Sequence, residues 1–342
     1  FRTARGTQEA VKSSVVVLVM IDTLDVKGFK SVRDIHLVCA RINLFIGEPN
    51  SGKSNILEAL GFLSHCAHDG HLREFVRLQQ AQNLFYDGLV EEGLWQFTVT
   101  GEANIDLTGK YEGKDYVFET PAHRPVLRLR HDGVSRTLNR QQEFAFLKFY
   151  RYKRSADMNS DDLGGLLPPD GRNMVALLFS SRELRQLAAD YFQPFGLQLV
   201  IKPHEHKLEV QKQSEGIIVS FPYRLASETL QRMVFYSVAI ESNRESTLVF
   251  EEPEAHAFPY YTKQFGERIA LDENENQFFV ATHNPYLLTA VVEKAPADDV
   301  AVFVTYYRDY ETRVKRLSEG QLGELLEQDP FMGIEHLLEE EV

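Results

Sequence analysis

The stretch "INLFIGEPNSGKSNILEALGFL", residues 42–63, decides the fold of this chain. Gly47 is followed after four residues by Gly52, Lys53 and Ser54, which matches the phosphate-binding pattern G-x-x-x-x-G-K-[ST] in full. The apolar run before the loop is typical of a buried strand, and the apolar residues after it have helical spacing. In such a strand, loop and helix, backbone N–H groups and the positive helix end face a phosphate chain. We therefore predict a nucleotide site in which Lys53 contacts the β- and γ-phosphates and Ser54 binds Mg²⁺.

The rest of the loop is expected to contact the nucleotide as well. The alternative is a glycine turn that only connects a core strand to a helix. The predicted nucleotide-contacting residues of the loop are Gly47, Glu48, Pro49, Asn50, Ser51, Gly52, Lys53, Ser54 and Asn55.

A second pair of apolar stretches supplies candidate catalytic groups. "STLVFEEPE", residues 246–254, places a buried-type strand directly before two carboxylates. A nucleotide hydrolase needs one acid near Mg²⁺ and one that deprotonates water, so we predict Glu251 at the metal, through water, and Glu252 as general base. "QFFVATHNP" ends another apolar strand at His283, which we expect beside the γ-phosphate. The alternatives are solvated acids at the end of a core strand and a structural histidine.

The composition limits the class of protein. The chain has 342 residues, of which 43% are apolar, enough for a large core and about two domains. No apolar stretch approaches the roughly 20 residues that cross a bilayer, so we expect no membrane span. The only cysteines, Cys39 and Cys66, suggest no disulfide framework and a reducing cytoplasm. The formal charge of −13 argues against a uniformly basic nucleic-acid binder.

A local basic and aromatic stretch, residues 124–154, could still bind DNA or RNA. It holds nine Lys or Arg residues against Asp132 and Glu143. Basic residues could follow a nucleic-acid backbone while aromatic rings stack on bases. The alternative, which we favour, is a half-buried strand and helix with a solvated basic face. The interleaved aromatic residues are Phe144, Phe146, Phe149, Tyr150 and Tyr152.

Hydrophobic periodicity predicts the remaining elements. Residues 95–136 alternate apolar with polar residues between glycine turns, which indicates an antiparallel sheet. Residues 161–173 read as a loop and residues 174–192 as a helix, followed by strands that turn at "KPHEHK" around His204 and His206, where we expect exposure to water.

The segments "GEPNSGKS", "LVFEEPEAH" and "ATHNP" together resemble the ABC-class heads of the SMC-like ATPases. The chain looks closest to stand-alone heads related to the overcoming-lysogenization-defect (OLD) family, because "MIDTLDVKGFKSVRDI" and "LLPPDGRNMVALL" also fit; the resemblance covers most of residues 20–305. It implies an α/β fold: a P-loop ABC-type head with a mainly parallel central sheet, an antiparallel β-subdomain and a mixed α/β insertion. The implied cofactors are ATP and Mg²⁺.

The resemblance also divides the chain. Residues 1–19, which begin without Met and look unlike the rest, are expected to be a vector-derived or upstream extension; a signal peptide is the weaker alternative, since no small-residue cleavage site follows the apolar run. The further parts are 20–94, the first part of the head with the P-loop; 95–219, a β-rich and helical insertion; 220–317, the second part of the head; and 318–342, an acidic helical tail.

The family's signature segment corresponds to "LASETLQRMVFYSVAI". There Ser227 matches the serine that contacts the γ-phosphate of the opposite subunit, whereas Glu228 or Thr229 stands in place of the expected glycine. Glu251 replaces the family's metal-side aspartate. The candidates for the family's glutamine loop are Gln79, Gln80 and Gln82.

The resemblance implies an ATPase that forms an ATP-dependent homodimer or higher oligomer. About 60 residues follow His283, too few for the nuclease domain of OLD proteins, and no coiled-coil arms interrupt the head. We therefore expect it to regulate a separately encoded nuclease or toxin in anti-phage defence or DNA processing. The alternatives are a nucleotide-binding scaffold with negligible turnover and a DNA-repair ATPase that acts directly on DNA.

A cluster of potential zinc ligands occurs in "SHCAHDGH". No second cluster completes a set of four, and the spacing matches no standard finger. We therefore interpret it as a solvated helix end. Its residues are His65, Cys66, His68, Asp69 and His71.

Overall fold

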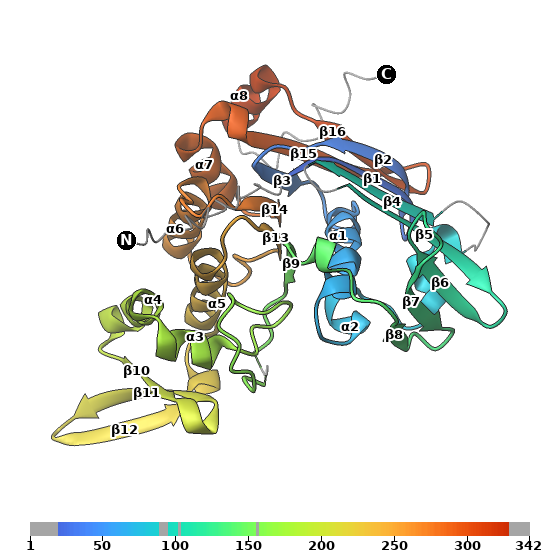
Figure 1. The fold of residues 1–342 in the computed structure, drawn as a ribbon. Helices are drawn as coiled ribbons and strands as arrows, with labels where there is room; N and C mark the ends of the chain where they lie inside the picture. Colours follow the sequence, from blue (N-terminus) through green and yellow to red (C-terminus); the bar gives the residue numbers. More distant parts are fainter. Residues whose placement is uncertain (1–19, 89–94, 102–103, 155–156, 328–342) are drawn as a thin grey trace, which may run out of the picture.

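The structure, a computed structural model, describes residues 20–88, 95–101, 104–154 and 157–327. The predicted extension at residues 1–19 and the last fifteen residues of the predicted acidic tail lie outside this range. Figure 1 shows a central sheet with α1 on one side and α5, α6 and α7 on the other.

The central sheet carries the P-loop strand in its interior. Its strands, in spatial order, are β16 (Glu311–Arg316), β15 (Val300–Arg308), β3 (Ile42–Ile46), β14 (Gln277–Ala281), β13 (Thr247–Glu251) and β9 (Leu147–Tyr150). All neighbours are parallel except β15 and β16. The predicted mainly parallel sheet is confirmed.

Helices cover both faces of this sheet. The helices of the described residues are α1 (Lys53–Ala67), α2 (Leu72–Phe75), α3 (Met174–Ser180), α4 (Arg182–Phe192), α5 (Glu228–Ser242), α6 (Pro259–Ala270), α7 (Pro285–Lys294) and α8 (Glu319–Glu327). Short 3₁₀ turns lie at Ala81–Leu84, Tyr86–Gly88, Gln142–Phe144, Gln193–Phe195, Pro203–Glu205, Tyr223–Leu225 and Ala297–Asp299. In the part of the chain that the structure describes, no helix has the length and apolar character needed to cross a membrane.

Strand β3 is buried along its whole length because it has parallel neighbours on both sides and helices over both faces. Phe45 faces α1, where its ring stacks with Phe279 and Phe303 at centroid distances of 6.3 and 5.1 Å. Leu44 belongs to the core under α5, α6 and α7. The alternation of side chains along the strand therefore divides it between two cores.

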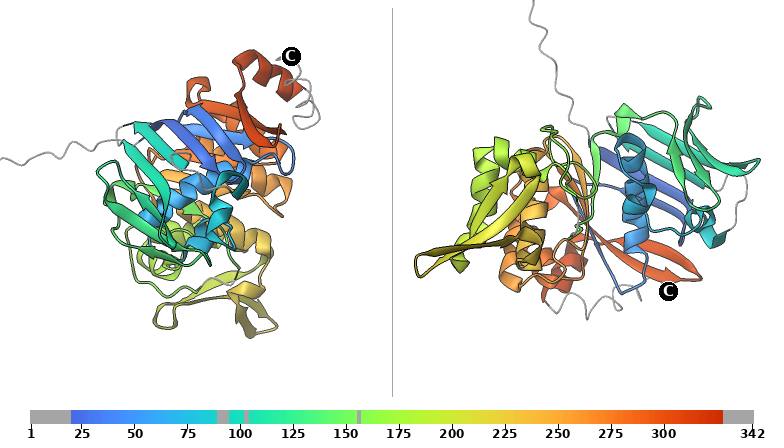
Figure 2. Two further views of the ribbon diagram at one scale, coloured as in Figure 1. Left: turned by 90° about the vertical axis from the view of Figure 1, so that its right-hand side faces the viewer. Right: turned by 90° about the horizontal axis from the view of Figure 1, so that it is seen from below.

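An antiparallel sheet lies against the opposite side of α1, as the two views in Figure 2 show. Its strands, in spatial order, are β2 (Val32–Val38), β1 (Ile21–Phe29), β4 (Trp95–Gly101), β5 (Ile105–Glu112), β6 (Asp115–Glu119), β7 (Pro125–Arg130) and β8 (Ser135–Thr137). Phe62 of α1 packs on Trp95 and Phe118 at ring distances of 5.2 and 4.8 Å. The antiparallel pattern predicted for residues 95–136 is confirmed, and β1 and β2 extend the same sheet.

The covered position of α1 corrects the interpretation of "SHCAHDGH" as a solvated helix end for its first residues, whereas Asp69 and His71 are exposed as expected. His65 and Cys66 are buried, and the His65 ring lies 5.3 Å from that of Phe75. Burial lowers the pKa of His65 to about 4. His68 Nε2 is 3.2 Å from the Leu147 carbonyl oxygen. The error arose because the second sheet, which covers the end of α1, cannot be inferred from the helix itself.

Strand β9 lies within the predicted insertion 95–219, yet it pairs with β13 in the central sheet. Its partner is about 100 residues away, so no local pattern could reveal the pairing. For residues 124–154, this placement agrees with the favoured interpretation of a half-buried strand and not with base stacking. Phe144, Phe149 and Tyr150 are buried in the cores, and the other two aromatic residues of the stretch pack against them, so these rings are not available to bases.

The third sheet forms a separate projection below α3 and α4 (Figure 1). Its strands are β10 (Gln198–Lys202), β11 (Lys207–Ser214) and β12 (Ile217–Pro222). The turn between β10 and β11 leaves His204 exposed, as predicted, whereas His206 is half-buried and lies 3.7 Å from Asp161. The helix predicted over residues 174–192 is interrupted at Ser181, which caps α4 by accepting a hydrogen bond from the Leu184 N–H.

Candidate nucleotide site

The loop between β3 and α1 is shaped by its glycines. Gly47 has φ 143° and Gly52 has φ 101°, values that side chains other than glycine rarely tolerate. A Cβ at Gly47 would overlap the Thr305 backbone, and one at Gly52 would overlap the Thr312 side chain. The hairpin of β15 and β16 therefore packs directly against the loop. This close contact requires glycine at both positions.

Lys53 begins α1 beneath this loop and is only 5% exposed. Its Nζ donates hydrogen bonds to the carbonyl oxygens of Gly47 and Glu48, at 2.7 and 2.8 Å. Burial lowers the pKa of Lys53 to about 8, although the nearby Glu252 and Glu48 oppose this shift. An ammonium group held in this way is suited to receive phosphate oxygens.

Glu252 and His283 meet because they follow adjacent parallel strands, β13 and β14. The Glu252 N–H donates to the Ala281 carbonyl at 3.0 Å, and Glu252 has a left-handed φ of 44°. This conformation is uncommon outside glycine and is concentrated at functional sites. His283 Nε2 lies 3.1 Å from Glu252 Oε1. The hydrogen bond from His283 holds the pKa of Glu252 below its ordinary value, so the carboxylate is ionised at neutral pH.

These groups surround one hollow of about 360 Å³. Its lining residues are Ser31, Pro49, Asn50, Ser51, Gly52, Lys53, Ser54, Asn55, Arg77, Glu252, His283 and Tyr307. The structure thus brings most of the predicted loop together with both predicted catalytic side chains. Gly47 and Glu48 lie at the base of the loop, where their carbonyl oxygens hold Lys53.

Sequence reasoning missed three lining residues, Ser31, Arg77 and Tyr307. Ser31 Oγ is 2.6 Å from Asn55 Nδ2 and 2.6 Å from Thr312 Oγ1, so it joins the β1–β2 turn to the loop and to β16. Arg77 stands two residues before the glutamine candidates, and Tyr307 lies on β15. None of the three belongs to a sequence motif, because each is brought to the hollow by packing between elements that are distant in the sequence.

Glu251 is held by arginine at the end of β13. Its Oε2 accepts hydrogen bonds from Arg151 Nε and Nη2 at 3.2 and 2.7 Å, and Arg77 Nη2 lies 3.7 Å from Oε1. Glu251 is not among the residues that line the hollow, unlike its neighbour Glu252. No sequence pattern indicates Arg151 as its partner.

The oxygen donors present are compatible with Mg²⁺. Ser54 offers a hydroxyl in the hollow, and Glu251 offers a carboxylate at the end of β13. Mg²⁺ prefers such oxygen ligands and is usually held by one or two protein groups together with substrate phosphates. Within residues 20–327, apart from the short gaps, no group of three or more His, Cys, Asp or Glu side chains could hold a metal by itself. The donor set therefore fits a metal that binds together with a nucleotide.

The remaining predicted residues lie away from this hollow. Ser227 is exposed at the N-terminus of α5, where its side chain makes no capping hydrogen bond. Thr229 Oγ1 donates to the His256 carbonyl at 2.8 Å, which ties α5 to the turn after Glu252. The glutamine candidates Gln79, Gln80 and Gln82 are exposed and do not line the hollow.

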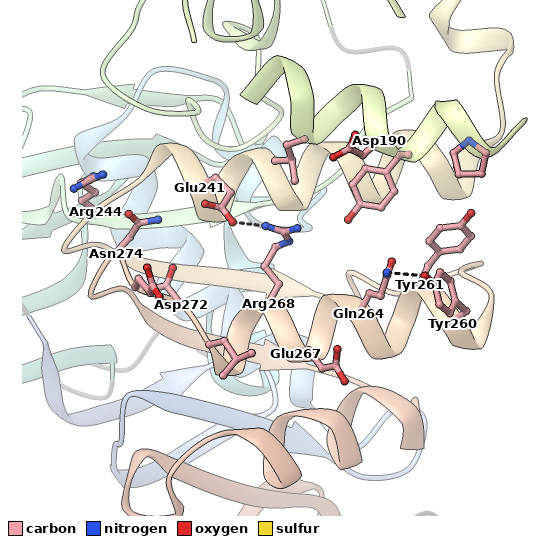
Figure 3. Close-up of a pocket in the computed structure, with 15 residues that line it drawn as sticks. Asp190, Glu241, Arg244, Tyr260, Tyr261, Gln264, Glu267, Arg268, Asp272 and Asn274 are labelled. Atoms are coloured by element: carbon pink, nitrogen blue, oxygen red, sulfur yellow. Dashed lines mark hydrogen bonds and ion pairs between the residues drawn. The ribbon is translucent and has the colours of Figure 1, made fainter. Parts of the chain in front are cut away.

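A larger hollow of about 870 Å³ lies between α4 and α6 (Figure 3). Glu241 and Arg268 form an ion pair across it, and Gln264 Nε2 donates to the Tyr260 hydroxyl at 2.9 Å. Its polar groups are thus partly engaged with each other, and no glycine-rich loop reaches it. The smaller hollow, which contains the loop with the phosphate-binding motif, is therefore the candidate nucleotide site.

The profile of the family described as "AAA domain, putative AbiEii toxin, Type IV TA system" matches residues 42–289. No curated protein matches the chain. Among solved structures, the Pyrococcus furiosus Smc head domain with an extended coiled coil, bound to the C-terminal domain of ScpA, has 14% identity and a TM-score of 0.56; the match covers 90% of this chain and 98% of that chain.

Two further Smc structures give similar values. An SmcHead bound to the C-winged helix domain of ScpA has 16% identity, a TM-score of 0.54 and coverage of 88% of this chain and 98% of that chain. The Pyrococcus yayanosii Smc head domain with a coiled coil and joint has 12% identity, a TM-score of 0.52 and coverage of 90% and 99%. At such identities the likeness shows the fold, and it confirms the predicted α/β fold of an SMC-like ABC ATPase head.

Proposed function

The chain belongs to this AAA-domain family, and from that premise we propose that it is an ATPase head that binds ATP with Mg²⁺ and hydrolyses it in a nucleotide-dependent dimer. One observation carries the proposal. The P-loop, Glu252 and His283 come from three separate parts of the sequence and converge on one hollow of about 360 Å³. A glycine turn without function would not require an ionised glutamate and a histidine opposite a buried lysine.

The P-loop would hold the phosphate chain of ATP. Its backbone N–H groups and the N-terminus of α1 favour negative charge. Lys53 would exchange its bonds to the Gly47 and Glu48 carbonyls for phosphate oxygens. Arg77 adds a second cation to the lining, and Tyr307 adds an aromatic surface. Ser54 and Glu251 would hold Mg²⁺, which, when bound, neutralises developing charge on the phosphates.

Glu252 is the proposed general base. Its carboxylate is ionised, so it can accept a proton from a water molecule that attacks the terminal phosphate. His283 fixes the carboxylate through the 3.1 Å contact and would stand beside the same phosphate. These roles require the terminal phosphate to lie at the ends of β13 and β14, where both side chains face the hollow.

The second subunit is proposed to act through Ser227. The exposure of Ser227 and its separation from the chain's own hollow support a contact with the nucleotide of a partner subunit. ATP would then stabilise a closed pair, and hydrolysis would release it, because the γ-phosphate contacts exist only before hydrolysis.

The output of this cycle is proposed to be regulation of another protein in the cytoplasm. The resemblance to OLD-related heads and the toxin–antitoxin description of the family support a separately encoded nuclease or toxin in anti-phage defence or DNA processing. The ScpA domains bound to the Smc heads support a protein partner on such a head.

A nucleotide-binding scaffold is the second candidate function. The pairing of Arg151 with Glu251 favours it, because the metal-side carboxylate is already neutralised. Direct action on DNA through residues 124–154 has less support. Their rings are in the cores, and Arg130, Arg140, Arg151 and Arg154 form ion pairs within the chain.

Light scattering and phosphate release test the proposal. We expect Glu252→Gln to bind Mg-ATP, to shift to a larger molar mass and to lose turnover, while the wild type hydrolyses ATP. The control is Glu273→Gln, an exposed site away from the loop, which should behave as the wild type. If the wild type binds ATP without releasing phosphate, the scaffold candidate holds instead. If no protein binds ATP, both are wrong.

A further inference from the structure

Glu58, on α1, is a buried carboxylate with several cationic partners. Its side chain is 0% exposed, and it accepts a hydrogen bond from Lys30 Nζ. It also accepts from the Arg77 N–H at 3.1 Å, from Arg77 Nε at 2.7 Å and from Arg151 Nη2 at 2.9 Å. Burial alone would raise the pKa of Glu58, but the charges of Lys30, Arg77 and Arg151 outweigh it and hold the pKa below its ordinary value. The group is therefore a charged centre.

Two of these cationic side chains, Arg77 and Arg151, connect Glu58 to the candidate nucleotide site. Arg77 lines the hollow, and Arg151 holds Glu251 at the end of β13. Arg77 is otherwise open to solvent, with a side chain that is 57% exposed. Its guanidinium is anchored by Glu58 at 2.7 Å, whereas Glu251 is farther away at 3.7 Å. The direction of Arg77 into the hollow thus depends on Glu58.

Arg77 is close to the proposed general base, since its charge is one of those that lower the pKa of Glu252. Its neighbour Glu251 directly precedes Glu252, and Glu252 and His283 line the same hollow. A guanidinium near a terminal phosphate favours ATP over ADP, because the additional charge is present only in ATP. An exposed arginine without an anchor would lose much of this advantage to side-chain entropy.

We propose that Glu58 is a positioning residue for the nucleotide site: it directs Arg77 toward the terminal phosphate of ATP and, through Arg151, fixes Glu251. This proposal rests on the proposed function, because it requires ATP in the hollow. The carboxylate itself does not touch the nucleotide. Its action is to hold two arginines in one arrangement through its negative charge, which a hydrophobic residue or a neutral amide lacks.

The alternative is a structural role alone. Lys30, Arg77 and Arg151 come from three different segments, so Glu58 also connects α1 to the β1–β2 turn, the segment after α2 and the end of β9. Removal of a buried partner leaves uncompensated charge and destabilises a protein whatever its function. Stability measurements therefore cannot separate the two roles. A measurement of the preference for ATP over ADP can separate them.

The test is the ratio of Kd values for Mg-ADP and Mg-ATP, measured by isothermal titration calorimetry on the full chain. We expect Glu58→Gln and Arg77→Ala each to lower this ratio on the order of tenfold, equivalent to about 1.4 kcal/mol. The double variant should have the same ratio as Arg77→Ala, because the action of Glu58 on this ratio passes through Arg77, whereas its action through Arg151 on Glu251 affects both nucleotides alike. Glu119→Gln is the matched control. It removes a carboxylate that is nearly buried and paired with Lys110 and His123, away from the hollow, and it should keep the ratio.

Other outcomes contradict the proposal. If Glu58→Gln reduces thermal stability but keeps the wild-type ratio, Glu58 is structural only. If Glu58→Gln does not fold, Arg77→Ala, whose site is half exposed, still decides: an unchanged ratio overturns the proposal. If the wild type binds neither nucleotide, the proposed function fails, and that failure is visible before any variant is compared.

Discussion

Glu254 shows how burial changes the chemistry of a single side chain. It is 5% exposed, and Thr282 Oγ1 donates a hydrogen bond to its Oε1. Its Oε2 has no hydrogen-bond partner among the residues that the structure describes. Burial raises the pKa of Glu254 to about 7, in spite of the bond from Thr282. The residue stands two positions after Glu252 and contacts the residue before His283, so its protonation bears on the site.

The raised pKa predicts a pH-dependent stability. Between the ordinary value of 4.5 and about 7, the folded state binds more protons at Glu254 than the unfolded state. The free energy of unfolding should therefore fall as pH rises through this range and remain lower above it, by about 3 kcal/mol. Glu254→Gln removes this contribution. Urea unfolding at pH 4.5, 6 and 8 should show that the free energy of unfolding of Glu254→Gln rises relative to that of the wild type as pH rises. A difference that stays constant with pH would contradict the raised pKa of Glu254.

Single residues of the site were predictable only where a local pattern marks them. Lys53 and Ser54 follow a complete motif, and Glu252 and His283 each follow an apolar strand, so the sequence pointed to all four. Arg77 and Arg151 carry no such mark. An arginine is common on any surface, and only the packing of α1 against β9 brings them to Glu58 and Glu251.

At the scale of elements, the close packing of the P-loop predicts that one added methyl group, in Gly52→Ala, lowers stability and prevents ATP binding. Gly52→Ala combines a left-handed φ of 101° with overlap on the Thr312 side chain. Backbone strain of this kind costs on the order of 1–3 kcal/mol before any displacement of β16. We expect a lower melting temperature and the loss of ATP binding, measured by scanning fluorimetry and calorimetry.

Gly216→Ala is the matched control for this loop. Gly216 also has a positive φ, 81°, but a Cβ there would meet no atom within 4 Å. It should show only the backbone strain and leave ATP binding unchanged. Equal loss of binding in both variants would mean that the contact with Thr312 is not what shapes the loop.

The elements themselves were largely predictable because each has a clear period. β3, β13 and β14 are apolar runs, and β4 and β5 alternate. Strand β9 was missed as a part of the central sheet, because pairing between distant segments leaves no trace in either one. The same limit applies to the second sheet over α1, which made a buried helix end look solvated.

At the scale of the whole molecule, α1 is the element that the two large sheets share. Phe62 is fully buried against Trp95, Phe97 and Phe118. Phe62→Ala should lower the free energy of unfolding by about 3–5 kcal/mol. Trp95 is the only tryptophan, so its fluorescence reports on this contact, while far-ultraviolet circular dichroism reports on all helices. In urea the two signals should change together; separate transitions would show that the sheets unfold independently.

The proposed pairing of two molecules gives a further prediction. Ser227→Arg should prevent the ATP-dependent increase in molar mass but leave unchanged the ATP affinity of the single subunit, measured at protein concentrations too low for pairing, because the side chain is exposed and away from its own hollow. Light scattering and calorimetry on the same preparation measure both quantities. Ser214→Arg, an equally exposed site at the end of β11, is the control. A loss of this single-subunit affinity in Ser227→Arg would place the serine in the chain's own site.

The position of β3 has a consequence for biosynthesis. Both neighbours of this strand, β14 and β15, come from the last third of the sequence. At typical rates of translation, the ribosome needs roughly 10–50 s to add the intervening stretch of about 230 residues. During that time the nascent chain holds an apolar strand with both edges unpaired. The P-loop is synthesised early, but the strands that flank β3 are synthesised late. The proposed ATP site therefore cannot form until β14 and β15 have emerged from the ribosome, and we expect chaperones to bind the chain mainly before that point.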